Sequence, residues 1–328
     1  MNKSTGIIVG AILVLIVSGI VVKHLVFPST EAPTHATSKP GFMEIIEVKA
    51  KIADVLGATP SGAGNAGDHY AQAVALFVAT EKVILDAAAA LGEGNAKDYP
   101  DALKTLEEIR GHIGTGAKQA SMDYMSKHAS GKLQVSTHQD DVERLDQSIN
   151  VLDILGDYYI KNKRLKDAEA MYRDMFVAGW HMINERSHIQ MAMYGQTIQA
   201  LALNGMSKSI EMTPDGDKQR AAMRDYLNAL DEFLTALRDK ELIFRKARLD
   251  AGDIWNIAEN DKDRAWRVQA ILAMALIKFT HDKSKANNAR NNAMIEKFLN
   301  SSDPLEKAAA QAAKAYTQID FNMVNSTW

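Results

Sequence analysis

The stretch LDILGDYYIKNKRLKDAEAMYRDM, residues 152–175, decides the expected fold of this chain. It has the apolar spacing of two helices joined by a short polar turn. Gly156 and Ala168 are small where two antiparallel helices would approach closely, and Tyr159 and Tyr172 are placed to fill the space between this pair and its neighbours. The stretch therefore predicts a helical hairpin that packs against further helices.

This segment, about residues 149–180, resembles a tetratricopeptide repeat. The matching residues are Leu152, Leu155, Gly156 and Tyr159 on the first helix and Ala168 and Tyr172 on the second. Trp180 stands where the family usually has proline, and Met175 is larger than the small residue expected there. A shift of 34 residues gives a poor second copy, so one unit is clear and its neighbours are degenerate. The resemblance implies stacked hairpins that bind proteins.

A second repeat lies near the C-terminus, where residues 263–276 align with residues 303–316, an offset of 303 − 263 = 40. The matched pairs are Asp263 with Asp303, Arg267 with Lys307, Ala270 with Ala310, Ala273 with Ala313, and Leu276 with Tyr316. This pair, about residues 253–318, resembles two HEAT-type repeats. The Asp residues suit helix N-caps, and the alanines suit helices that stack closely.

Helical periodicity covers almost everything after residue 43, and no alternating stretch of strand length appears. The pattern predicts helices at 43–56, 69–91, 100–112, 116–129, 139–161, 165–178, 181–204, 218–249, 253–259, 264–280, 285–300 and 304–318. We expect an all-α body, an α-solenoid or a set of stacked helical hairpins. Its expected regions are an N-terminal helical region (43–138), a tetratricopeptide-like region (139–250) and a HEAT-like region (251–328).

The N-terminal sequence predicts a transmembrane helix. Gly6 to Val22 contains no charge, and if Lys23 snorkels the apolar span is 6–27, or roughly 33 Å at the helical rise per residue. A cleaved signal peptide is the alternative, but its apolar region is shorter, and the one suitable small-x-small site, at 34–36, lies far beyond the apolar end. We therefore expect residues 1–27 to form an uncleaved signal anchor.

Residues 28–42 hold three of the seven prolines and predict an extended linker between anchor and body. The charges that flank the span are nearly balanced, with Lys3 and the amino terminus before it and Lys23 and Lys39 against Glu31 after it. The short N-terminal tail and its slight positive bias favour a cytoplasmic N-terminus. The body is then expected on the periplasmic or extracellular side.

Composition excludes several kinds of chemistry. The 328 residues carry a formal net charge of −3, which argues against nucleic-acid binding, and no cysteine, which excludes disulfides and thiol catalysis. The sequence contains no P-loop, dinucleotide fingerprint or nucleophile elbow. Asp68 at a helix start is favoured as a cap, and His128 falls near a loop. We expect no cofactor.

The strongest candidate for chemistry is WHMINERSH, residues 180–188. His181, Glu185 and His188 recur at i, i+4 and i+7 on one helical face, a set that can hold zinc or iron. The second Glu-x-x-His of di-iron bundles and the His-Glu-x-x-His of zinc proteases are both absent. The alternative is a polar helix face whose histidines make local hydrogen bonds.

The two repeat resemblances imply protein–protein interaction without intrinsic catalysis. We therefore expect a membrane-tethered scaffold for unidentified protein partners, with contact positions around the tetratricopeptide-like groove at Tyr159, Lys163, Arg164 and Arg173. A metal-binding bundle or enzyme that uses His181, Glu185 and His188 is the alternative. A purely structural anchor or assembly subunit is a third reading.

Overall fold

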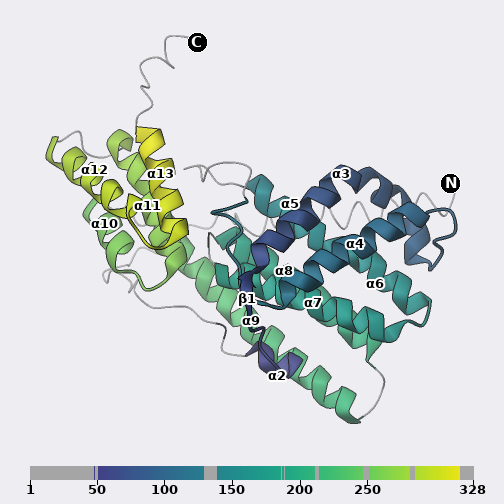
Figure 1. Cartoon of the computed structure of the whole chain (residues 1–328). Coiled ribbons are helices and arrows are strands. Elements are labelled where there is room, and N and C mark those ends of the chain that lie inside the picture. The colour runs from purple at the N-terminus through teal and green to yellow at the C-terminus, as the bar shows by residue number, and fades with distance from the viewer. Residues whose placement is uncertain are drawn as a thin grey trace, which may run out of the picture.

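The computed structural model describes residue 48 and residues 51–128, 139–185, 187, 189–210, 214–246, 251–280 and 285–317. Within these ranges most residues are helical and the strands are two short segments, which confirms the expected all-α class (Figure 1). The expected anchor (1–27) and linker (28–42) lie outside the described residues. Among the helices that the structure does describe, none is both long and apolar enough to cross a membrane.

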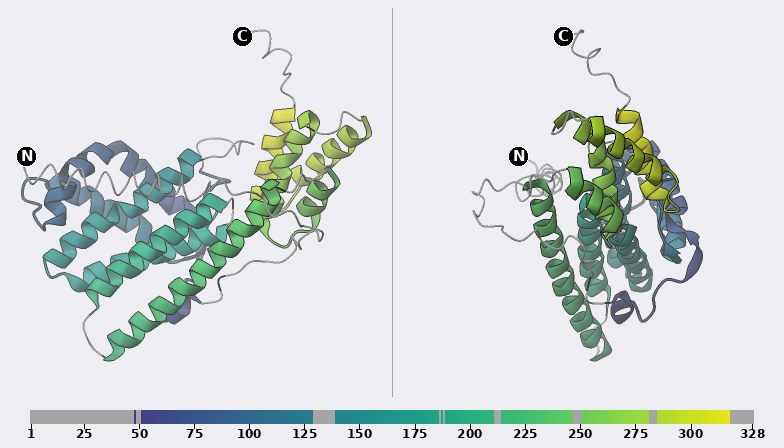
Figure 2. Two further views of the ribbon diagram at one scale, coloured as in Figure 1. Left: turned by 180° about the vertical axis from the view of Figure 1, so that it is seen from behind. Right: turned by 90° about the vertical axis from the view of Figure 1, so that its left-hand side faces the viewer.

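The elements run along the chain in this order: α2 (Ile52–Leu56), β1 (Gly62–Asn65), α3 (Ala66–Gly92), α4 (Pro100–Ala117), β2 (Gln119–Ser121), α5 (Gln139–Asn150), α6 (Leu152–Lys161), α7 (Leu165–Glu185), α8 (Ile189–Ser209), α9 (Pro214–Lys246), α10 (Ala251–Asn260), α11 (Arg264–Thr280), α12 (Lys285–Leu299) and α13 (Pro304–Thr317). The strands β1 and β2 pair in parallel. The α3–α4 hairpin packs on α5, α6 and α7, so helices from the expected N-terminal and tetratricopeptide-like regions share one core. The long helix α9 runs diagonally from the lower end of this body toward α10–α13 (Figure 2).

Two glycines let α7 and α8 approach each other closely. A Cβ at Gly179 of α7 would lie 2.5 Å from the carbonyl oxygen of Gly195 in α8, and a Cβ at Gly195 would lie 2.5 Å from that of Gly179. Any side chain larger than hydrogen at either position would push the two helices apart. Gly179 therefore serves close packing within a continuous helix, and the break that the sequence suggests between 178 and 181 does not occur.

The hairpin of α6 and α7 contains the tetratricopeptide-like stretch. The ring of Tyr172 is fully buried and lies against Gly156 of α6 and Gly205 of α8, where added Cβ atoms would collide with it. Its hydroxyl donates a hydrogen bond of 2.8 Å to Asp153. Ala168 is also fully buried. The small residues and the tyrosine thus occupy the inter-helix positions that the sequence predicts for them.

The four C-terminal helices pack against one another. Asp263 and Asp303 cap α11 and α13, since each side chain accepts a hydrogen bond from a backbone N–H two residues on, at 3.1 and 2.9 Å. Arg264 donates two hydrogen bonds to Asp303, at 2.7 and 2.6 Å, and Arg267 donates one of 2.6 Å to Glu306. The matched segments 263–276 and 303–316 therefore begin side by side and are joined by ion pairs.

A buried asparagine of α12 connects this helix to α10 and α11. Asn291 of α12 accepts a hydrogen bond of 3.1 Å from the Trp255 indole of α10. Its amide donates one of 2.8 Å to the backbone oxygen of Met274 in α11. One side chain from α12 therefore ties together α10 and α11.

Three further expected helices differ in the structure. The expected helix 116–129 is absent, because α4 ends at Ala117 and the chain then forms β2 and a turn. The expected helix 139–161 is interrupted at Val151, which separates α5 from α6, and only 52–56 of the expected helix 43–56 is described as helical. In the first case tertiary contacts override helix propensity, since Gly62 donates to the Lys118 carbonyl at 2.9 Å and draws the chain into the strand pair.

Candidate functional site

The last turns of α7 place two members of the expected metal set in the core. His181 and Glu185 are 1% and 2% exposed and lie on one helical face, as their spacing predicts. Both side chains point toward the segment 119–125, which runs between α3 and α7 after α4 has ended. We refer to 119–125 as the clamped segment.

Both ring nitrogens of His181 are hydrogen-bonded. Nε2 lies 2.9 Å from the carbonyl oxygen of Gln119, and Nδ1 lies 2.7 Å from the hydroxyl of Tyr70 on α3. A carbonyl can only accept, so Nε2 carries the proton and Nδ1 accepts from the tyrosine. Burial lowers the pKa of His181 to about 4, which keeps the imidazole neutral. The histidine thus joins α7 to both α3 and β2.

Glu185 holds the next part of the clamped segment. Its Oε1 accepts hydrogen bonds from the backbone N–H groups of Tyr124, at 3.0 Å, and Met125, at 2.7 Å. Burial raises the pKa of Glu185 to about 7, and the negative charge of Asp123 adds to the effect, while the backbone hydrogen bonds and Arg264 oppose it. The Oε2 atom is buried with no hydrogen-bond partner in the described part of the chain.

Two glycines leave room for this arrangement. A Cβ at Gly116 of α4 would collide with the ring of Tyr70, and a Cβ at Gly67 of α3 would lie 2.8 Å from the carbonyl oxygen of Asp123. The backbone of the clamped segment therefore passes directly against the start of α3. These glycines position the tyrosine and the loop that His181 and Glu185 bind.

Residues at the start of α3 bind Asp123 and the turn that follows it, residues 124–128. Asn65, the N-cap of α3, accepts from the backbone N–H of Asp123 at 2.7 Å and donates to its carbonyl oxygen at 3.1 Å. Nε2 of His128 lies 2.6 Å from Oδ1 of Asp68, and the side-chain hydroxyl of Ser126 donates to Asp123. Asp68 thus pairs with a histidine, while Asn65 does the capping.

The structure describes two of the three residues of the alternative metal site, His181 and Glu185. His188 lies outside the described residues, and within the described ranges no three His, Cys, Asp or Glu side chains form a group that could hold a metal ion. His181 could bind a metal only after giving up its hydrogen bond to Tyr70, because that bond uses the free lone pair of the neutral ring. The geometry of His181 and Glu185 is that of a structural clamp on residues 119–125.

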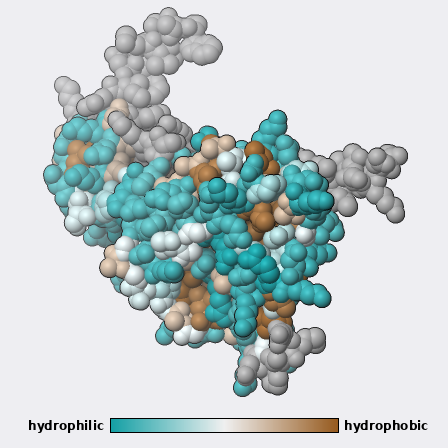
Figure 3. All heavy atoms as spheres, turned by 45° about the vertical axis from the view of Figure 1, so that its right-hand side comes forward, coloured by the Kyte–Doolittle hydropathy of each residue, from teal (hydrophilic) through white to brown (hydrophobic). Residues whose placement is uncertain are grey.

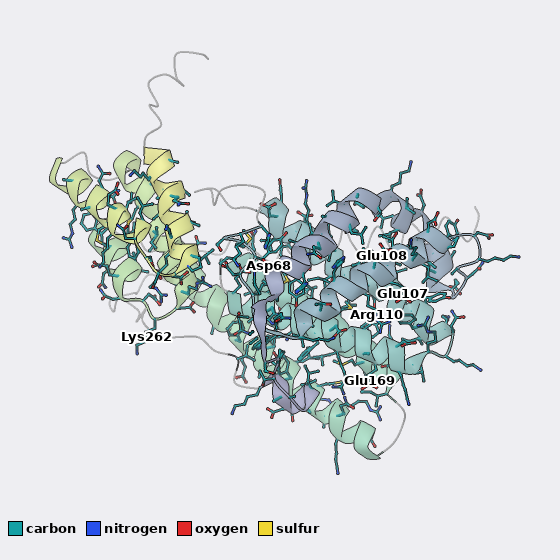
Figure 4. All side chains as sticks on the ribbon, viewed as in Figure 1. Asp68, Glu107, Glu108, Arg110, Glu169 and Lys262 are labelled. Carbon is teal, nitrogen blue, oxygen red and sulfur yellow. The ribbon has the colours of Figure 1, made fainter. Side chains whose placement is uncertain are left out.

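The four expected contact positions are not equivalent. Tyr159 is fully buried, which corrects its assignment as a surface contact: its hydroxyl accepts from Arg110 at 2.7 Å, and the Arg164 guanidinium lies 4.3 Å from its ring centroid. Arg110 belongs to α4, beside Glu107 (Figure 4). The aromatic ring is thus a packing and cation–π platform between helices.

The remaining three positions lie nearer the surface. Arg164 is exposed and donates to Asp167 at 2.7 Å. Arg173 is half-buried, and its guanidinium donates to the Leu56 carbonyl at 3.3 Å, which fastens the end of α2. Lys163 is exposed in the α6–α7 turn with a φ of 59°.

A surface feature that the sequence analysis missed lies on α3. Val78, Val83 and Leu85 are 45%, 47% and 50% exposed, and they are the large hydrophobic side chains that stand out as exposed among the described residues. The helix lies at the outer edge of the body in two opposite views (Figures 1 and 2). In Figure 3, hydrophobic atoms emerge between hydrophilic ones toward the top of the face shown. Alanine and aliphatic side chains are found on both the buried and the exposed side of α3.

The comparisons with other proteins give no relative. No protein-family model matches the chain, and neither a curated protein nor a solved structure shows significant similarity to it. The resemblances to tetratricopeptide and HEAT repeats therefore remain predictions from the sequence.

Proposed function

We propose that this chain is a membrane-tethered helical scaffold that binds a protein partner through the outward face of α3. The uncharged run from Gly6 to Val22 supports the tether, and the helical body supports the scaffold. The body is proposed to lie on the periplasmic or extracellular side, separated from the bilayer by the Pro-rich linker 28–42. In this proposal no catalytic step is needed.

The single observation that carries the binding role is the exposure of Val78, Val83 and Leu85. Exposed large apolar side chains that gather on one helix mark interaction sites more often than scattered ones do. The opposite side of the same helix supplies buried residues such as Ile84 and Leu91 to the core, so the helix is already anchored. About half of the surface of each exposed aliphatic side chain therefore remains available to a partner.

The finer architecture is also part of the proposal. The α6–α7 hairpin and the α10–α11 and α12–α13 hairpins are proposed as repeat units of the tetratricopeptide and HEAT kinds, stacked into a solenoid-like body. Buried small residues at inter-helix positions, such as Gly156 and Ala310, support this interpretation. Lys163, exposed in the turn of the first hairpin, stays a proposed contact position.

One observation favours the alternative of a metal-binding protein. The Oε2 atom of Glu185 is buried and has no hydrogen-bond partner within the described residues, and His188 follows three positions later. A bound cation would satisfy that oxygen. Metal analysis of the purified full-length chain, with His188→Ala as the comparison, tests this alternative. Stoichiometric metal that His188→Ala removes supports it, whereas metal content that the substitution leaves unchanged eliminates it.

The binding role is tested by photo-crosslinking in the native membrane. A benzophenone amino acid replaces Val78 or Leu85 on α3, and the control replaces Lys104 of the neighbouring helix α4, whose side chain is 77% exposed. We expect discrete protein adducts from the two α3 positions and none of the same mass from position 104. Equal labelling from all three positions, or no adduct from α3, would contradict the proposal.

A further inference from the structure

The outward face of α3 has a pattern that suits a copy of itself. Between and beside the exposed aliphatic side chains lie small ones, and the exposed members are Ala75, Ala79 and Ala89. Alanines at these spacings let a second helix approach closely, while Val78 and Leu85 on one flank and Val83 on the other supply apolar area. The face is thus shaped for a helix rather than for a small ligand.

The charges on this face are self-complementary. Lys82 and Asp86 are both exposed, lie four residues apart and sit in the middle of the face. When two copies of α3 pack antiparallel about a two-fold axis near residue 84, each Lys82 lies opposite Asp86 of the second copy. A parallel, in-register pair would place lysine beside lysine and aspartate beside aspartate, which repel.

We propose that the outward face of α3 is a homodimer contact, in which two copies of this chain pack antiparallel and exchange Lys82–Asp86 ion pairs. An isologous two-fold contact of this kind is the commonest way in which identical chains associate. Glu81, at the margin of the face, lies outside the exchanged pairs. This proposal rests on the proposed function, since it names the partner of the surface proposed there.

The tether matters for the strength of the association. One helical face buries less than the roughly 800 Å² per partner of a standard interface, so association in free solution is weak. Chains held in one membrane are confined to a thin layer, which raises their effective concentration. A two-fold axis perpendicular to the membrane lets both N-terminal segments enter the same bilayer.

Charge reversal in mixed samples tests the proposal. Because the chain has no cysteine, a Lys104→Cys background gives one dye site on α4, next to α3. Full-length chains labelled with donor or acceptor and reconstituted together in lipid vesicles report association by energy transfer as the ratio of protein to lipid rises. The variants are Lys82→Glu, Asp86→Lys and both together, and thermal unfolding by circular dichroism checks that each exposed substitution leaves the fold intact.

We expect each single reversal to weaken self-association at least about tenfold, because two like charges then face each other at both ends of the contact. An equimolar mixture of the two single variants should recover energy transfer, since it pairs an acidic face with a basic one, and the double variant should self-associate. Recovery of energy transfer in the mixture is expected only if Lys82 and Asp86 form ion pairs between two chains. The proposal is overturned if the single variants associate like the parent chain or if the mixture does not recover.

The outcome also separates this proposal from the broader one. Photo-adducts from Val78 that contain a different protein, together with no energy transfer in the parent chain, would overturn the homodimer and leave the binding role of α3 intact. An absence of adducts and of energy transfer would overturn both. Adducts of twice the mass of the chain, together with recovery in the mixture, support both.

Discussion

Tyr70 and His181, which are 111 positions apart in the sequence, are joined by a buried hydrogen bond of 2.7 Å between the tyrosine hydroxyl and Nδ1 of the imidazole. This bond links the start of α3 to the last turns of α7. The same imidazole binds the carbonyl of Gln119, so one side chain connects three elements that the sequence separates widely.

Removing the tyrosine hydroxyl should destabilise the protein. Tyr70→Phe leaves Nδ1 of His181 buried without a donor, which costs about 1–3 kcal/mol of unfolding free energy. Chemical denaturation of Tyr70→Phe, His181→Phe and the double variant measures the coupling. We expect the two effects to be non-additive by about 0.5 kcal/mol or more, as for residues in direct contact. Strict additivity would show that the hydrogen bond contributes nothing to stability.

Glu185 should give the protein a characteristic pH dependence. Its pKa is about 7 in the folded state against a usual value of 4.5, so the folded state binds the proton more tightly than the unfolded state does. The contribution of this group to stability is therefore greatest below pH 4.5 and is lost as the pH rises toward 7, by roughly 3 kcal/mol. The amide side chain of the Glu185→Gln variant cannot ionise, so the variant does not lose stability at this position as the pH rises. The destabilisation caused by Glu185→Gln should shrink from pH 4.5 to 7, as measured by denaturation in the presence of a chelator.

His181 acts in the opposite direction over a similar range. Its pKa is about 4 in the folded state against 6.5, so the unfolded state takes up a proton first as the pH falls. The parent chain therefore loses stability between pH 6.5 and 4 through this residue, and His181→Phe does not. Measured over the same pH series, the deficit of His181→Phe should shrink toward low pH. A deficit that shrinks toward high pH would contradict the assignment of a neutral, buried imidazole.

The crossing of α7 and α8 gives a test of close packing. Gly195→Ala places a methyl group 2.5 Å from the Gly179 carbonyl oxygen and 3.0 Å from Ile183, so the helices must separate at a cost of about 1–3 kcal/mol. Gly111→Ala in the interior of α4 is the matched control, because no atom outside its own helix lies within 4 Å of the added methyl. That substitution should stabilise the protein by about 0.5–1 kcal/mol through helix propensity. Equal effects of the two substitutions would disprove the packing argument.

The tether is tested by topology. In the proposed orientation, with the amino terminus in the cytoplasm, a reporter enzyme fused after Trp328 should be active outside the cytoplasm. Deleting residues 6–22 should move the chain out of the membrane fraction. Reporter activity only in the cytoplasm would contradict the proposed orientation. A deletion variant that stays in the membrane fraction would contradict the proposal that residues 6–22 anchor the chain.

Local patterns in the sequence predicted several features correctly. Gly156 and Tyr172 occupy the inter-helix positions expected from their sizes. Asp263 and Asp303 cap helices, as expected for a residue whose short side chain accepts hydrogen bonds from nearby backbone N–H groups. His181 and Glu185 share a helical face because a spacing of four residues places them there. Each of these features depends on interactions within about one hairpin or on helix geometry alone.

Long-range contacts escaped the same reasoning. Gly62–Asn65 has no strand-forming residue pattern, and it pairs with β2 only because the fold brings Lys118 and Gln119 beside it. The partners of His181 and Glu185 lie 60–111 positions away, at a distance where a single sequence carries no pairing signal. The exposed side of α3 was missed for another reason: alanine and aliphatic residues lie on both sides of this helix, so its own sequence does not show that Val78, Val83 and Leu85 face solvent.

The most direct test of the central claim separates binding from folding on α3. The double substitution Val78→Glu and Leu85→Glu changes two side chains that are about half exposed, so the unfolding free energy should stay within about 0.5 kcal/mol of the parent value. In the native membrane, photo-adducts formed from a benzophenone at Ala75 should be strong in the parent chain and lost in this variant. Adducts that persist at the parent level in a folded variant would contradict the account, since the apolar face of α3 would then not be the surface that binds.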